Sequence, residues 1–197
     1  MDLFYQIVLN SIIAGAIYTM IALGFNLVYG ITKFFNITHG ALLLIGAYTV
    51  LFLYRISGLN LFLSVFAGIL TAGISGRLSD KLIFLPLRKR KATALTMFVA
   101  SLGLFIVLQT VIMLLFTSQY QSLAQGDVIP KAYEILGGVI TKVQVIIIIA
   151  VILITMSLTL VLNKTKFGKA IKAITDDEEV AKVLGINTDG IISSVFF

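Results

Sequence analysis

Few side chains in this sequence are suited to catalysis or metal binding. Among 197 residues there is one histidine, His39, and no cysteine, which excludes disulfides, thiolate metal sites and centres built from several histidines. The Gly168-Lys169 pair is followed by alanine, so the chain has no P-loop with which to bind ATP. We therefore expect no catalytic residue, no cofactor and no metal ion, in a protein that is not itself an enzyme.

The most informative polar spacing lies between Asn163 and Gly190. Four lysines precede an acidic run: Lys164, Lys166, Lys169 and Lys172, then Asp176, Asp177, Glu178 and Glu179. Thr175 and Glu178 have capping-box spacing, which predicts a helix start at Thr175, and Gly185 is suited to end that helix in the left-handed conformation. A polar helix between apolar stretches is suited to contact a partner. The residues equally allow a solvated connector whose acids only cap a helix.

A second polar group, Asn36, His39 and Gly40, stands where an apolar stretch begins. Asn36 is suited to cap the helix that follows, and a histidine near membrane depth often lines a transport pathway. We expect these residues, with Gln109, to shape a translocation pathway or its inner gate, His39 acting through hydrogen bonds. A capping turn packed against neighbouring backbone is the alternative.

Membrane helices are the elements that must position these groups. Apolar residues make up 59% of the chain, charged residues 12%, and the mean hydropathy is +1.06. A bilayer core about 30 Å thick needs roughly 20 apolar residues per helix. Stretches near or above this length cover residues 3–32, 37–54, 59–76, 92–132 and 143–162, and another begins near Ile191. We predict an all-α polytopic transmembrane helical bundle of about five spans plus the start of a sixth, as one domain over residues 1–197.

The positive residues predict the orientation of this bundle, because lysine and arginine are retained on the cytoplasmic side. Twelve of the fifteen would be cytoplasmic: Lys33, Arg77, Lys81, Arg88, Lys89, Arg90, Lys91, Lys164, Lys166, Lys169, Lys172 and Lys182. Arg55, Lys131 and Lys142 would be outside, and so would the N-terminus. Since this explains the net charge of +6, we expect membrane lipid as a partner and no nucleic acid.

Small and polar residues predict how the helices pack. Gly68, Ala72 and Gly76 recur every four residues, a pattern that allows two helix backbones to approach closely in lipid. The polar side chains within the apolar stretches are expected to bond across helices; they are Asn10, Ser11, Asn26, Ser101 and Gln109. No Asp or Glu falls within the five stretches, apart from Asp127 near the end of one.

Four motifs run along the chain in order: GFNLVYG from Gly24 to Gly30, NITHG from Asn36 to Gly40 with Gly46-Ala47-Tyr48, SLGL from Ser101 with Gln109, and FGKAIKA from Phe167 to Ala173. Together they resemble the branched-chain amino acid permeases of ABC transporters, in particular the LivH-like subunit. The sequence from Glu179 to Gly185 is similar to the coupling loop of ABC importer permeases, with Val180 where that motif has a second small residue. The resemblance implies that residues 164–190 form a cytoplasmic coupling loop, with Glu178, Glu179, Ala181 and Gly185 as ATPase-coupling residues.

What the resemblance implies for function is a permease subunit in the cell (inner, cytoplasmic) membrane that moves leucine, isoleucine or valine. The expected partners are a second permease subunit, cytoplasmic ATP-binding subunits that hydrolyse ATP, and an extracytoplasmic solute-binding protein docking near residues 117–142. The alternatives are a permease of this family for urea, amides or other amino acids, or an ion-coupled secondary transporter. Members of the family continue with further helices, so we expect this chain to need a complementary segment for transport.

Overall fold

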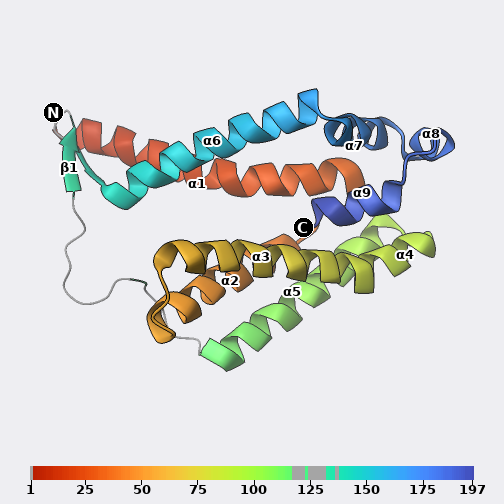
Figure 1. The fold of residues 1–197 in the computed structure, drawn as a ribbon, viewed down its shortest axis with the longest axis horizontal. Coiled ribbons are helices and arrows are strands. Elements are labelled where there is room, and N and C mark those ends of the chain that lie inside the picture. The colour runs from red at the N-terminus through yellow and green to blue at the C-terminus, as the bar shows by residue number, and fades with distance from the viewer. Residues whose placement is uncertain (1, 117–122, 124–131, 136–137) are drawn as a thin grey trace.

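A computed structural model describes residues 2–116, 123, 132–135 and 138–197 of the chain (Figure 1). This part is almost entirely helical, with one short antiparallel hairpin. In chain order the elements are α1 (Asp2–Thr32), α2 (Thr38–Leu51), the π-helical turn η1 (Phe52–Ile56), α3 (Leu61–Ser79), the π-helical turn η2 (Asp80–Phe84), α4 (Leu85–Lys89), α5 (Ala94–Phe116), β1 (Ala132–Ile135), β2 (Gly138–Thr141), α6 (Lys142–Lys164), α7 (Lys166–Asp176), α8 (Glu178–Val183) and α9 (Thr188–Val195).

Five of the described helices are long and apolar enough to cross a bilayer. They cover Leu3–Thr32, Thr38–Ile56, Leu61–Lys89, Ala94–Phe116 and Lys142–Lys164, which confirms the polytopic helical fold. The third is longer than its uncharged stretch, because α3 continues through η2 and α4 to Lys89. Asp80 and Arg88 pair with each other inside this continuous helix, so its charges do not end it.

The hairpin before α6 is a feature that hydropathy does not predict. Strand β1 pairs with β2 in antiparallel register, with Tyr133 opposite Ile140. The Gln6 side chain holds β2 against α1, since its Oε1 accepts from the Val139 amide at 2.7 Å and its Nε2 donates to the Val139 carbonyl at 3.2 Å. Residues 117–122, 124–131 and 136–137 of the polar segment expected outside lie outside the described residues.

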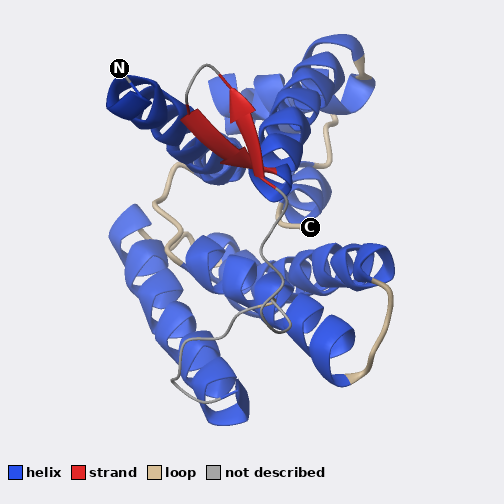
Figure 2. Ribbon diagram, turned by 90° about the vertical axis from the view of Figure 1, so that its left-hand side faces the viewer, coloured by secondary structure: helices blue, strands red, loops and turns tan. Residues whose placement is uncertain are grey.

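The helices form two groups that Figure 2 shows one above the other. Helices α1 and α6 lie side by side in one group, and α2, α3 and α5 form the other (Figure 1). Helix α9 bridges them, since it contacts α1 and α7 and leads to Phe196 and Phe197, which pack on α3. The end of the molecule that holds α4, α7 and α8 (Figure 1) also holds Lys33, which lines one pocket with Arg88, Lys89 and Lys182. We call it the basic end, since the charges assigned to the cytoplasmic side gather there.

Small residues allow the closest helix contact in the second group. A Cβ atom on Gly68 would lie 2.9 Å from the Gly46 carbonyl oxygen and 2.6 Å from Cγ2 of Val50, and one on Gly46 would lie 3.4 Å from Cβ of Ala72. The predicted small-residue face therefore joins α3 to α2. Gly76 differs, because its missing side chain admits the Phe196 carbonyl at the end of α9.

The principal buried cluster lies at the basic end. Its members come from most of the elements there: Val28, Ile31, Phe34, Phe84, Met97, Ile171, Ile174, Ala181, Ile192 and Phe196. Phe84 packs between Phe34 and Phe196, with ring centroids 5.2 and 5.4 Å away. Because α1, η2, α5, α7, α8 and α9 all contribute, the elements at this end are held in fixed positions relative to one another.

Candidate functional site: a capped helix at the basic end

Helix α7 turns sharply from α6 and sets the starting point of α8. Thr165 begins it, with Oγ1 accepting from the Gly168 amide at 3.0 Å. A side chain on Gly168 would overlap the Val161 carbonyl, so the turn requires glycine. Ile171 and Ile174 are buried, whereas the lysines of α7 are exposed. An apolar side held in the cluster and a charged side in solvent are what an amphipathic helix provides.

Asp177, and not Thr175, caps the short helix α8. Its Oδ1 accepts from the amides of Glu179 at 2.9 Å and Val180 at 3.0 Å, and its φ and ψ are −155° and 112°. The predicted start at Thr175 is wrong because Thr175 belongs to the last turn of α7, which must continue that far to bury Ile174. Aspartate is as good an N-cap residue as threonine, and Asp177 of the acidic run takes this position.

Gly185 ends α8 in the left-handed conformation, with φ of +80°, as the sequence predicts. Its amide donates to the Lys182 carbonyl at 3.0 Å, and the Ile186 amide donates to the Ala181 carbonyl at 3.1 Å. This pair of bonds is the Schellman motif. Helix α8 therefore has a hydrogen-bonded cap at each end, which holds six residues in one conformation.

Exposure divides the residues of α8 into an anchoring side and a free side. Ala181 is 1% exposed within the buried cluster, while Val183 is 87%, Leu184 72% and Val180 53% exposed. Glu178 forms an ion pair with Lys182 at 2.6 Å, and Glu179 is exposed. Of the expected coupling residues, Ala181 anchors the helix in the cluster, and the exposed Glu179 side chain has no partner among the described residues. Sequence reasoning missed Val180, Val183 and Leu184, although their i, i+3 and i+4 spacing places apolar side chains on one face of a helix.

Asn36, His39 and Gly40 gather where α1, α2 and α5 meet. Helix α2 begins at Thr38, with Ile37 at the N-cap position. Asn36 Oδ1 accepts from the Thr38 amide at 3.1 Å, so the first amide of α2 is satisfied by the residue before the N-cap. The Thr38 hydroxyl donates to the Ser101 carbonyl at 2.9 Å, and the Ile37 amide donates to Ser101 Oγ at 3.2 Å. Asn36, Thr38 and Ser101 are all buried. A polar junction thus joins the start of α2 to α5.

His39 and Gly40 pack against the neighbouring helices. A Cβ on Gly24 would lie 3.0 Å from Cε1 of the His39 ring, and one on Gly40 would lie 3.4 Å from Phe105, so glycines admit the rings at these contacts. The His39 side chain has no hydrogen bond to the described residues. Gln109 lies elsewhere, exposed on α5 and two turns beyond Ser101.

Of the polar side chains expected to bond across helices, Ser101 does so. Asn10 bonds to Gln6 on its own helix and Ser11 to the Ile7 carbonyl, because intrahelical partners are nearer. Asn26 and Gln109 are exposed and have no hydrogen bond within the described part of the chain. For those two residues the prediction is wrong in this structure.

A buried ion pair lies beside the cluster and was not predicted. Asp80 is fully buried, and Nη1 of Arg88 donates to its Oδ1 at 2.7 Å. Asp80 Oδ2 and the Nε and Nη2 atoms of Arg88 have no partner within the described part. Hydropathy placed Asp80 after the third span and Arg88 in a charged turn, but the continuous helix from Leu61 to Lys89 brings them together. No group of three or more metal-ligating side chains occurs among the residues described.

A family profile described as branched-chain amino acid transport system / permease component matches residues 7–197. The chain is 28% identical to the high-affinity branched-chain amino acid transport system permease protein BraD of Pseudomonas aeruginosa. It is 30% identical to the corresponding LivH proteins of Salmonella typhimurium and Escherichia coli K12.

Each of these alignments covers 98% of this chain and 66% of the relative. The chain therefore spans just under two thirds of the length of these relatives. No solved structure matches it. The profile match over residues 7–197 nevertheless includes all five apolar helices, the α1–α2–α5 junction and α8. The chain belongs to the family of branched-chain amino acid transport permease components.

Proposed function

We propose that this chain is a permease subunit of an ABC importer for branched-chain amino acids in the cytoplasmic membrane. It forms half of a pore with a second permease subunit and receives leucine, isoleucine or valine from an extracytoplasmic solute-binding protein. Separate cytoplasmic subunits hydrolyse the ATP. Family membership supports this function, as do its relatives BraD and LivH, which are permease proteins of branched-chain amino acid transport systems.

The observation that carries the proposal is the free side of α8. Val180, Val183 and Leu184 project from the basic end, outside the five apolar helices. Apolar side chains clustered at the tip of a polar segment are typical of a protein contact, and few buried anchors supply most of the affinity in such contacts. We assign this surface, with Glu179 beside it, to docking on an ATP-binding subunit.

The caps and the anchor give α8 the rigidity that coupling needs. Ala181 packs in the same cluster as Val28 of α1 and Met97 of α5. A movement of the docked ATPase is thereby passed to helices that flank the Asn36–His39–Gly40 junction. Such coupling requires that the two conformations of the permease bind the two states of the ATPase with different affinity.

Placing a charge on the docking surface tests this function. In reconstituted complexes, Leu184→Asp should lower substrate-stimulated ATP hydrolysis by about tenfold or more, because an unpaired charge buried at a protein contact costs several kcal/mol. Ser194→Asp, at an exposed position of α9, is the matched control and should leave hydrolysis near the unmodified rate. Normal coupling in the Leu184→Asp complex would refute docking through α8.

A further inference from the structure

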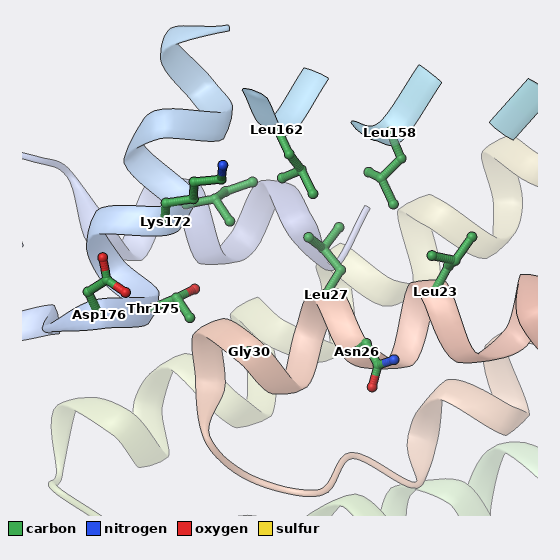
Figure 3. A pocket seen from close by; sticks show the side chains of 10 residues that line it. Leu23, Asn26, Leu27, Gly30, Leu158, Leu162, Lys172, Thr175 and Asp176 are labelled. Atoms are coloured by element: carbon green, nitrogen blue, oxygen red, sulfur yellow. The ribbon is translucent and has the colours of Figure 1, made fainter. Parts of the chain in front are cut away.

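A groove runs between α1 and α6 and opens beneath α7 at the basic end (Figure 3). Its volume is about 360 Å³. Leucines form its two walls: Leu23 and Leu27 from α1, Leu158 and Leu162 from α6. Gly30 leaves it open on the α1 side, because a Cβ there would meet only Thr175, at 3.9 Å. The apolar part of the groove is therefore accessible along two spanning helices.

The mouth of the groove carries one cationic and one anionic side chain. Lys172 and Asp176 are one helical turn apart on α7, with Thr175 between them. Nζ of Lys172 donates to Asn163 Oδ1 at 2.6 Å, and an ammonium has two further N–H donors. No ion pair joins Lys172 to Asp176 within the described chain. The two charges are therefore both available to a ligand.

Polarity falls with depth along the groove. Asn26 lies four residues of α1 below Gly30, about 6 Å deeper, and lines the groove with an amide that has no hydrogen bond to the described residues. Leu27 and Leu162 lie beside the mouth, and Leu23 and Leu158 continue the walls about one helical turn deeper, at the level of Asn26 and below it. Diacyl phospholipids have the same order along their length: charged headgroup, ester carbonyls, then hydrocarbon.

We propose that the groove binds a phospholipid with a zwitterionic headgroup that ends in a primary ammonium, phosphatidylethanolamine. Its phosphate contacts Lys172 and its ammonium contacts Asp176. The Asn26 amide donates to an ester carbonyl, and one acyl chain lies between the leucine walls. The site belongs to the leaflet at the basic end, which the positive-inside rule assigns to the cytoplasmic side.

Charge complementarity selects this headgroup over the other common ones. A choline headgroup carries a methylated nitrogen that cannot donate a hydrogen bond to Asp176. A purely anionic headgroup would bring a second negative charge to that carboxylate. Anionic lipid is still attracted to Lys164, Lys166 and Lys169 as a basic surface, but these lysines do not line the groove. Substitutions in the groove therefore test specific lipid binding, and substitutions of these lysines test general attraction of anionic lipid.

Native mass spectrometry of the purified full chain with added lipid tests the site. Phosphatidylethanolamine should be retained about tenfold more than phosphatidylcholine of the same acyl chains, as expected for one hydrogen bond between charged groups. Asp176→Asn should remove this preference, and Lys172→Gln should weaken binding of both lipids. Lys166→Gln, which makes the same charge change outside the groove, should leave the preference unchanged.

Filling the groove gives an independent test. Gly30→Leu should abolish the retained lipid, whereas Gly15→Leu on α1, where a side chain meets nothing within 4 Å, should not. Equal retention of phosphatidylethanolamine, phosphatidylcholine and phosphatidylglycerol would overturn the proposal. Retention of lipid by Gly30→Leu would also overturn it, and so would a Lys166→Gln protein that loses the preference for phosphatidylethanolamine as fully as Asp176→Asn does. A third contrary result would be a Leu158→Cys variant that cross-links to a second permease subunit at this groove. Because no transport is measured, failure here leaves the proposed function standing.

Discussion

Adjacent residues of α8 face opposite surroundings, and this decides which of them can touch a partner. The motif shared with ABC importer permeases points to Ala181, yet that side chain is enclosed by the cluster with Phe34 and Phe84. A small residue is needed there because a larger one would be overpacked. The exposed Val183 and Leu184 are the side chains left for contact. Ala181 therefore anchors the helix, and the docking surface that we propose lies between the motif positions.

Gly185 should be sensitive to substitution because of its backbone conformation alone. At φ of +80° a β-branched side chain is strained by roughly 1–2 kcal/mol, so Gly185→Val should loosen the end of α8. We expect normal abundance in the membrane and reduced transport-coupled ATP hydrolysis, measured on reconstituted complexes.

Gly15→Val is the control for this change. It makes the same substitution at a position of ordinary backbone conformation with open space around it, and coupling should be unaffected. Equal coupling in Gly185→Val and in the unmodified protein would show that the left-handed end of α8 is not needed.

His39 is the residue at which the pathway hypothesis can be separated from simple packing. If the ring bonds a passing substrate or a water in the pathway, His39→Ala should lower the uptake rate roughly fivefold, the effect of losing one hydrogen bond worth about 1 kcal/mol. Removal of the ring also leaves a cavity beside Gly24, so the thermal stability should fall in either case, and the uptake rate of the correctly inserted protein decides between the two roles. Unchanged uptake with reduced stability would make His39 a packing residue beside Gly24.

At the scale of elements, the helix from Leu61 to Lys89 depends on the Asp80–Arg88 pair. Asp80 is fully buried, and removing one partner of a buried pair typically costs about 3–5 kcal/mol. Arg88→Met should therefore lower the melting temperature of the purified protein clearly. Lys89→Met, which removes an exposed charge one residue further, should change it little.

The double variant Asp80→Leu/Arg88→Met distinguishes pairing from a need for either charge. Apolar replacement of a whole buried pair is often neutral or stabilising, so the double variant should melt higher than Arg88→Met. A double variant at least as unstable as the single one would mean that Asp80 has another role.

The elements themselves were largely predictable from hydropathy, and their ends were not. Uncharged length locates five spans because bilayer thickness demands it. The predicted end of the third span was wrong, because hydropathy does not reveal that two charges eight positions apart will pair. The prediction of the residue that caps α8 was wrong for a related reason. Thr175 and Asp177 are both good caps, and only the burial of Ile174 in α7 decides between them.

At the scale of the whole molecule, the two helix groups meet mainly where the positive charges gather. The buried cluster joins α1, α5, α7, α8 and α9 there, and both the proposed docking surface on α8 and the proposed lipid groove adjoin α7. Which polar residues face inward could not be read from the sequence. Ser101 and Gln109 stand eight residues apart on one helix, yet Ser101 is buried and Gln109 is exposed, because the helix rotation relative to α2 decides the outcome.

A cysteine cross-link from α8 is the sharpest test of docking on an ATP-binding subunit. Since the chain contains no cysteine, Val183→Cys introduces a unique thiol at an exposed position. In membranes that hold the assembled transporter, this thiol should cross-link to the ATP-binding subunit, and Leu59→Cys in the turn at the opposite end should not. If Val183→Cys captures no ATP-binding subunit, or reacts only with reagents confined to the outer face, α8 is not the docking element.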